Sequence, residues 1–177
     1  LNTFIKINYF LVPILLISCA TSKSIHPNKE GDFTIAFGSC NKQKKENILW
    51  KEIQKNKPNL WVWGGDNIYA DTDNIDTLRR SYQTLKKQKG YADLVQNISV
   101  MATWDDHDYG VNDGGVEFSK KEMSQKVFLD FFNVDKKSPR RNQNGVYHSE
   151  IFKTSKGSVK VLVLDTRYFR TPLTKSK

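Results

Sequence analysis

The chain has 177 residues, which is enough for one domain with a substantial core. It carries 28 Lys and Arg against 19 Asp and Glu, a formal net charge of +9 that favours phosphate-bearing partners. No nucleic-acid-binding signature accompanies this charge, so we expect no nucleic-acid partner. The lysines can also be explained as solvated helix faces and loops, and charge alone therefore identifies no partner.

The N-terminal segment has the pattern of an export signal. Lys6 precedes an apolar stretch over residues 9–17, far shorter than the ~20 residues that a membrane-spanning helix needs. The stretch runs into "LISC", which resembles a bacterial lipobox, so residues 1–18 predict a lipoprotein signal peptide and Cys19 the lipidated residue. The alternative is an ordinary signal peptide cut nearby. Residues 19–32 predict a polar tether, and the protein would be exported and held at a membrane by lipid.

Strands and helices alternate along residues 33–177, which we expect to form one domain. The expected elements are strand 33–39, helix 45–56, strand 59–65, helix 75–88, strand 98–103, helix 119–133, and a hairpin with strands 146–152 and 159–165. Ile48, Leu49 and Ile53 are expected on the inward face of the first helix. Ser119 and Glu122 have the spacing of a capping box at the start of the last helix. This alternation predicts an α/β layer fold.

A polar cluster follows each of four predicted strands. The clusters are "GSCN" with Cys40, "GGDNIYAD" with Asp66, Tyr69 and Asp71, "TWDDHDYGVND" with His107, and "DTRYFR" with Asp165 and Arg167. In layer folds the chemistry collects on loops at the carboxyl ends of strands, so we expect these four loops to converge on one edge of the sheet. Carboxylates, a thiol, a phenol, a histidine and an arginine together indicate a metal and phosphate site. Any one loop alone could be an ordinary turn.

Two features of the clusters favour a cation. Asp105, Asp106 and Asp108 are crowded around His107, and like charges so close together form either a well-solvated turn or a cation site. If Cys19 carries lipid, Cys40 is an unpaired thiol in an exported protein, and metal binding would explain why a free thiol is present there. A small buried apolar side chain is the alternative for this cysteine.

The segments "FGSCN", "WVWGGDNIYAD", "TWDDHDYG" and "LDTRYFR", in this order, resemble the alkaline phosphatase D family, the PhoD-like branch of the calcineurin-type metallophosphoesterases. The resemblance extends over residues 33–172, and four spaced motifs are more specific than any one of them. It implies a layered calcineurin-like sheet sandwich, a phosphoester substrate, and two or more metal ions, with iron and calcium as the pair.

The resemblance also implies the metal ligands. Cys40 stands where most calcineurin-type enzymes have a D-x-H motif, and in this branch the cysteine binds the metal. Asp66 would bridge two metals, Tyr69 would bind as a phenolate, and Asp106 would be a further ligand. Asn112 is an additional candidate. Thiolate, phenolate and carboxylate ligands together suit ferric iron, whereas calcium prefers oxygen-rich neighbouring sites.

The catalytic candidates are His107 and Arg167. By the same resemblance His107 faces the substrate phosphate, where it can steady developing charge or protonate the leaving alcohol. A structural loop histidine is the alternative. Asp105 and Asp108 are candidates for holding its ring or a second calcium. The guanidinium of Arg167 suits a phosphate clamp, and the alternative for it is a salt bridge to Asp165.

Members of the family continue into a second half with a GD-x-H-type motif, which does not follow Asp165 here. We therefore expect a fold that is incomplete at its C-terminus. The expected function is metal-dependent hydrolysis of phosphate mono- or diesters, and the alternative is a catalytically incomplete metal- or phosphate-binding surface lipoprotein. A lipase-type or sugar hydrolase is set aside, because the chain has neither G-x-S-x-G nor a plausible carboxylate pair.

Overall fold

A computed structural model describes residues 33–174 of the chain. The predicted signal peptide over residues 1–18, the lipidation site Cys19 and the tether over residues 19–32 lie outside the described residues, so those expectations stay predictions. Within residues 33–174, no helix is long and apolar enough to cross a membrane.

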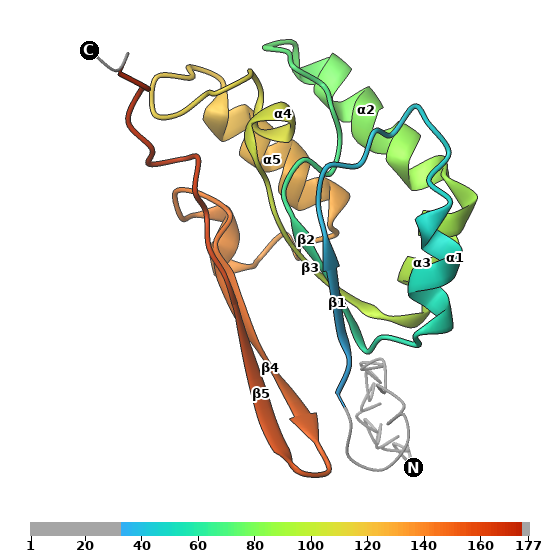
Figure 1. Ribbon diagram of the computed structural model, residues 1–177. Coiled ribbons are helices and arrows are strands. Elements are labelled where there is room, and N and C mark those ends of the chain that lie inside the picture. The colour runs from blue at the N-terminus through green and yellow to red at the C-terminus, as the bar shows by residue number, and fades with distance from the viewer. Residues whose placement is uncertain (1–32, 175–177) are drawn as a thin grey trace, which may run out of the picture.

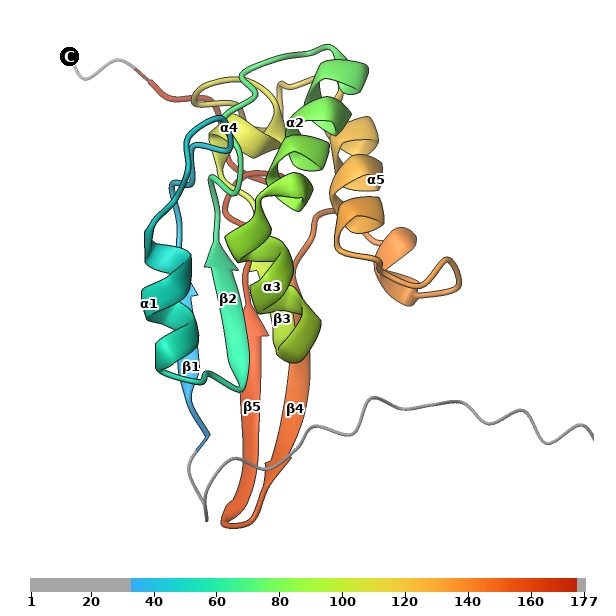
Figure 2. The same cartoon turned by 90° about the vertical axis from the view of Figure 1, so that its right-hand side faces the viewer.

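The fold has a parallel sheet with helices on one face and a hairpin on the other (Figures 1 and 2). The sheet has the order β1-β2-β3, with β1 (Ile35–Gly38), β2 (Leu60–Gly64) and β3 (Ser99–Thr103) all parallel. The helical elements are α1 (Leu49–Lys55), α2 (Ile75–Lys87), α3 (Lys89–Asn97), α4 (Asp106–Tyr109), α5 (Lys121–Phe131) and the 3-10 helix η1 (Pro139–Arg141). The hairpin consists of the antiparallel strands β4 (His148–Thr154) and β5 (Gly157–Val163). These elements confirm the expected α/β layer fold.

Strand alternation directs an aromatic cluster toward the helices. Trp61 and Trp63 lie two residues apart on β2, so both side chains point to the same face of the sheet. Trp50 of α1 meets each of them edge to face, with ring centroids 5.6 Å apart. A Cβ at Gly90 would lie 2.7 Å from Cβ of Trp50, so only a glycine lets α3 approach α1 this closely. This core fixes the sheet against α1 and α3.

The opposite face of the sheet is only partly covered. Leu60 and Met101 are buried there against Phe152 and Val163 of the hairpin. The register pairs Ile35 with Leu60 and Phe37 with Val62, which places the Ile35 and Phe37 side chains on this same face. Phe37 is nevertheless 81% exposed, because the hairpin packs over β2 and β3 and leaves β1 open.

Several expectations about local structure are wrong. The first helix begins only at Leu49, and its buried residue is Trp50, so Ile48 and Leu49 are exposed and not inward. The helix at residues 121–131 has Lys120 as N-cap without a side-chain hydrogen bond, so the capping box at Ser119 does not form. Helices α3 and α4 were not expected. The expected hairpin is confirmed, and its strands β4 and β5 form a two-stranded sheet of their own.

Candidate metal centre

The loops after β1, β2 and β3 are bonded together at the carboxyl edge of the parallel sheet. The Asn41 backbone N–H donates to the Asp66 carbonyl at 2.9 Å, and the Asn41 amide donates to the Asn67 carbonyl at 3.2 Å. The Asn67 amide then donates to the Thr103 carbonyl at 2.9 Å. Asn41 and Asn67 are both buried, so these bonds are shielded from water and hold the three loops in a fixed arrangement.

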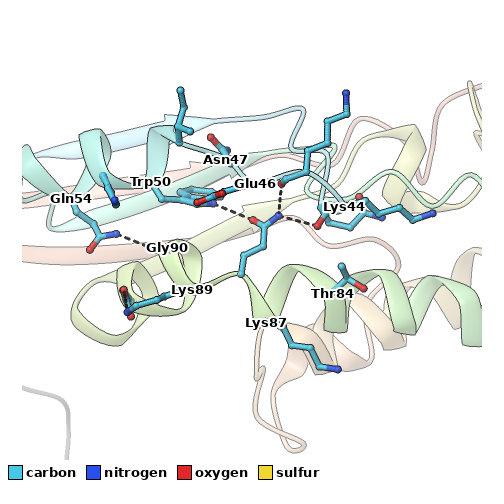
Figure 3. Close-up of a pocket in the computed structure, with 15 residues that line it drawn as sticks. Lys44, Glu46, Asn47, Trp50, Gln54, Thr84, Lys87, Lys89 and Gly90 are labelled. Atoms are coloured by element: carbon cyan, nitrogen blue, oxygen red, sulfur yellow. Dashed lines mark hydrogen bonds and ion pairs between the residues drawn. The ribbon is translucent and has the colours of Figure 1, made fainter.

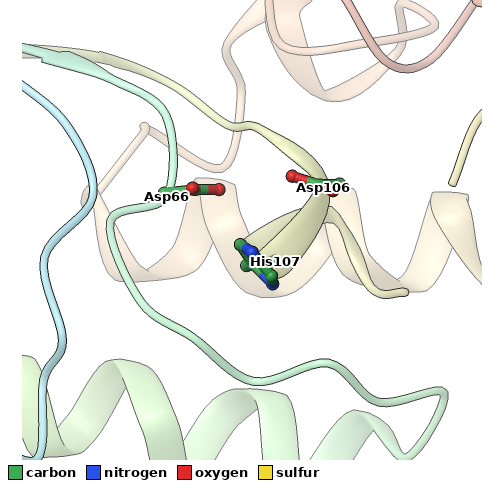
Figure 4. A group of neighbouring side chains, drawn as sticks. All are labelled: Asp66, Asp106 and His107. Carbon is green, nitrogen blue, oxygen red and sulfur yellow. The ribbon is translucent and has the colours of Figure 1, made fainter. Parts of the chain in front are cut away.

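Asp66, Asp106 and His107 form a group that could hold a metal ion (Figure 4). One ligand atom from each residue lies within 4.8 Å of the others. Asp66 follows β2, whereas Asp106 and His107 begin α4 shortly after β3, and both aspartates are 7% exposed. Among the described residues, this is the group of three or more His, Cys, Asp or Glu side chains with that geometry.

Cys40 and Tyr69 complete the inner surroundings of Asp66. The Cys40 Sγ lies 3.6 Å from Asp66 Oδ2, and the Tyr69 hydroxyl donates to the same oxygen at 3.2 Å. The other carboxylate oxygen, Asp66 Oδ1, is buried and has no hydrogen-bond partner within the described part of the chain. A buried carboxylate oxygen without a donor is costly unless something positive reaches it, so this atom is suited to a cation.

Backbone conformation at the centre is unusual. Cys40 has φ +60° and Asp66 has φ +50°, in the left-handed region that side chains rarely adopt. Gly65, which lies between the end of β2 and Asp66, has φ +109°, and a Cβ there would lie 2.7 Å from Cβ of Asp105. The glycine lets the β2 loop approach the start of α4 this closely.

Asp71 holds the His107 ring. Its Oδ1 lies 2.5 Å from His107 Nδ1, and the Tyr69 ring lies against the imidazole with centroids 4.2 Å apart. Partial burial lowers the pKa of His107, but the hydrogen bond to Asp71 and the charges of Asp66, Asp71 and Asp106 outweigh it, so the pKa lies above its ordinary value. The expectation that Asp105 or Asp108 holds this ring is wrong, because the residue that contacts its Nδ1 is Asp71.

Arg167 lies between two carboxylates of the α4 segment. Its Nε hydrogen-bonds Asp105, and its guanidinium is 3.5 Å from Asp106 Oδ1, with the side chain only 15% exposed. Burial raises the pKa of Asp106, but the Asp113 backbone N–H and the Arg167 charge outweigh it and hold that pKa below its ordinary value. The alternative salt bridge to Asp165 is wrong, because the Asp165 carboxylate instead accepts backbone N–H groups, including that of Arg167 at 2.9 Å.

Two further residues of this region lie outside the group. Asp108 is fully buried and accepts from the backbone N–H groups of Asp105 and Asn67 and from the Tyr82 hydroxyl, so it braces the loops. Burial raises its pKa to about 8. Asn112 is exposed and its amide donates to Asp113, so the structure does not bring this expected ligand to the group.

The donor set fits a cation. Two buried carboxylates, one with an unsatisfied oxygen, face an imidazole, with a thiol and a phenol beside them. Burial, and then Cys40 and Asp66, hold the pKa of Tyr69 above its ordinary range, so the phenol is a donor to Asp66 until a cation competes for it. The positive charge of a bound cation lowers the pKa of nearby ligands and so favours their deprotonated forms.

Comparisons with known proteins show the fold. No family model matches the sequence, and no curated protein matches it either. Among solved structures, the chain is similar to that of PhoD, with a TM-score of 0.67 at 18% sequence identity. The match covers 84% of this chain and 34% of the PhoD chain, so this chain spans about a third of that protein's length. The expected PhoD-like resemblance is thus confirmed at the level of the fold.

Proposed function

We propose that this chain is part of a metal-dependent hydrolase of phosphate mono- or diesters, of the alkaline phosphatase D type. The observation that carries the proposal is the approach of Asp66, Asp106 and His107 at one sheet edge, with Asp66 Oδ1 buried and lacking a partner among the described residues. The PhoD-like fold supports it, because α/β layer folds bind their ligands at this edge.

The proposed cation ligands are Asp66, Asp106, Cys40 and Tyr69, with iron and calcium as the proposed metals. Once bound, such ions act as Lewis acids on a phosphoryl oxygen and lower the pKa of a water molecule. Asp66 is the proposed bridging ligand, since Cys40 and Tyr69 both touch one of its oxygens while the other is unsatisfied.

The protein's own groups would manage charge and protons. Because Asp71 occupies Nδ1 of His107, Nε2 is the ring nitrogen left for a phosphate oxygen or the leaving group. Partial burial lowers the pKa of His107, but the hydrogen bond to Asp71 and the nearby carboxylates raise it overall, which is the direction that favours a general acid. Arg167 forms ion pairs with both Asp105 and Asp106. In this proposal it therefore positions Asp106, and its positive charge attracts the phosphate.

Cation binding tests the centre directly. Isothermal titration of the full chain with Fe³⁺, Mn²⁺ and Ca²⁺ should show saturable binding, and Asp66→Asn should weaken it by about tenfold or more because a charged ligand is lost. The matched control is Asp76→Asn, whose carboxylate is 73% exposed and pairs with Arg79 away from the centre. Equal affinities for Asp66→Asn and the unchanged chain would overturn the proposed centre.

Turnover separates the hydrolase from a second candidate, a catalytically incomplete metal- or phosphate-binding surface lipoprotein. With metal bound, hydrolysis of alkyl phosphate mono- and diesters, whose alkoxide leaving group needs a proton, should fall at least about 100-fold in His107→Gln if the chain catalyses the reaction. Metal binding without any hydrolysis to lose supports the binding protein instead.

We also propose that the protein is exported and anchored to a membrane through lipid on Cys19. The proposal rests on the lipobox-like "LISC" and the polar residues 19–32 that follow it. In a bacterial host, the unchanged chain should incorporate labelled palmitate and partition with membranes. Cys19→Ala should lose both properties, and label retained by Cys19→Ala would contradict the assignment.

A further inference from the structure

A groove of about 720 Å³ lies on the helical side of the molecule (Figure 3). One wall is the loop after β1 together with α1, and the other is the junction between α2 and α3. Its volume is within the range of about 300–1,000 Å³ that is common for small-ligand sites. None of the candidate metal ligands lines it, so it is a separate feature.

The groove is strongly basic. Five lysines line it from both walls, against two acids, Glu46 and Asp93. Lys89 pairs with Asp93 at 2.7 Å, whereas the side chains of Lys44, Lys45, Lys51 and Lys87 form no ion pair within residues 33–174. Lysines on both walls add their charges to a positive potential over this concave surface. An anion with several charges would complement this potential.

The walls are tied together by hydrogen bonds, so the groove is already formed. Gln88 at the α2–α3 junction donates to the carbonyls of Gln43 and Lys45 at 2.9 Å each, and it accepts from the Trp50 indole at 3.1 Å. Gln54 of α1 donates to the Gly90 carbonyl of α3 at 3.1 Å. A ligand would therefore not have to order the walls, which lowers the cost of binding.

We propose that this groove binds an anion carrying two or more phosphate groups. Lysine ammonium groups are compact charges that bind phosphate oxygens, and lysines on both walls require a ligand with charge at more than one point. Ile48 is 77% exposed at the groove and gives an apolar contact for the part of the ligand between phosphates. The inference does not depend on hydrolysis at the metal centre.

Tripolyphosphate is the probe for the site, titrated calorimetrically into the full chain in chelator-containing buffer so that no metal bridges the phosphates. Saturable binding is expected, weakening steeply with added salt. Lys44→Gln combined with Lys87→Gln should weaken it by about tenfold. Glu46→Gln, which removes a repelling charge from the groove, should strengthen it.

The matched control is Lys153→Gln with Lys160→Gln, which removes the same charge from the exposed hairpin. Its affinity should stay within about twofold of the unchanged chain. Equal weakening by both pairs would show general charge attraction and overturn the site. Loss in Arg167→Gln with no loss in the groove pair would place the phosphate at the metal centre and also overturn it.

A second arm identifies the source of the phosphate. Co-sedimentation with phosphatidylcholine vesicles, with and without phosphatidylglycerol, tests lipid headgroups. Groove-dependent binding of tripolyphosphate supports the proposal. Groove-dependent binding of the anionic vesicles alone would overturn it in favour of a lipid surface, because each phosphatidylglycerol headgroup carries one phosphate. Binding of neither probe, with the variants folded by circular dichroism, overturns the proposal.

Discussion

Gly65 controls how closely the β2 loop approaches the start of α4, and replacing it with alanine should both destabilise the fold and open the candidate centre. Its φ of +109° is unfavourable for any side chain, at a cost of about 1–2 kcal/mol. A Cβ there would also lie 2.7 Å from Cβ and 2.8 Å from the backbone nitrogen of Asp105. Backbone cannot rotate away as a flexible side chain can, so overpacking adds about 1–3 kcal/mol.

The free energy of unfolding should therefore fall by about 2–5 kcal/mol in Gly65→Ala, a decrease in melting temperature of roughly 5–15 °C for a chain of this size. Urea titration followed by far-ultraviolet circular dichroism measures the change, with a lower midpoint and an unchanged m value. Because the clash displaces Asp105, which precedes Asp106, cation affinity should fall as well.

The neighbouring Gly64 is the matched control. Its φ is not positive, and a Cβ there would meet only the Gly38 carbonyl oxygen at 3.6 Å and the Ser39 Cβ at 3.7 Å, which are ordinary contacts. Gly64→Ala should be neutral or more stable by up to about 1 kcal/mol, since alanine restricts the unfolded chain. If the two variants unfold within about 0.5 kcal/mol of each other, the close approach at Gly65 is not what holds the loops.

Three other changes test the remaining structure. Asp108→Ala should cost about 2–4 kcal/mol in urea unfolding, because it strips buried donors of their acceptor, whereas an unchanged midpoint would refute that bracing role. Burial, and then Arg140, lower the pKa of His148 from 6.5 to about 4. The unfolded chain therefore takes up this proton first, so the free energy of unfolding is highest above pH 6.5 and decreases as the pH falls toward 4. Partial exposure reduces this to about 1–2 kcal/mol, which His148→Gln should remove from the pH dependence of unfolding. The double variant Phe37→Thr with Leu162→Thr should bind less of a hydrophobic dye, because these side chains are 81% and 65% exposed. Its free energy of unfolding should fall by less than about 0.5 kcal/mol, and a larger decrease would mean that the two side chains are packed.

The convergence of the site residues was predictable because it follows from topology. Once residues 33–39, 59–65 and 98–103 are parallel strands, Cys40, Asp66 and the "DDHD" segment must meet at one edge. That argument needs only strand positions, which hydrophobic patterns indicate well. It does not need the path of any loop.

The partners within the site were not predictable for the same reason. Asp71 reaches His107, and Asp105 reaches Arg167, because of how the loops turn after the strands. No periodicity governs those turns. The amphipathic pattern that placed Ile48 and Leu49 inward failed similarly, since α1 begins only at Leu49 and what it buries is decided by Gly90 of α3.

Backbone conformation supplies information about the centre that the residue types do not. A cysteine in the left-handed region costs about 1–2 kcal/mol, and glycine would remove that cost at Cys40, whereas aspartate adopts this region more readily. Packing does not offset the cost, because Cys40 is exposed. Strain of this kind is typical of functional sites. The positive φ of Cys40 therefore favours a requirement for a thiol at this position, independently of the distance that brings it to Asp66.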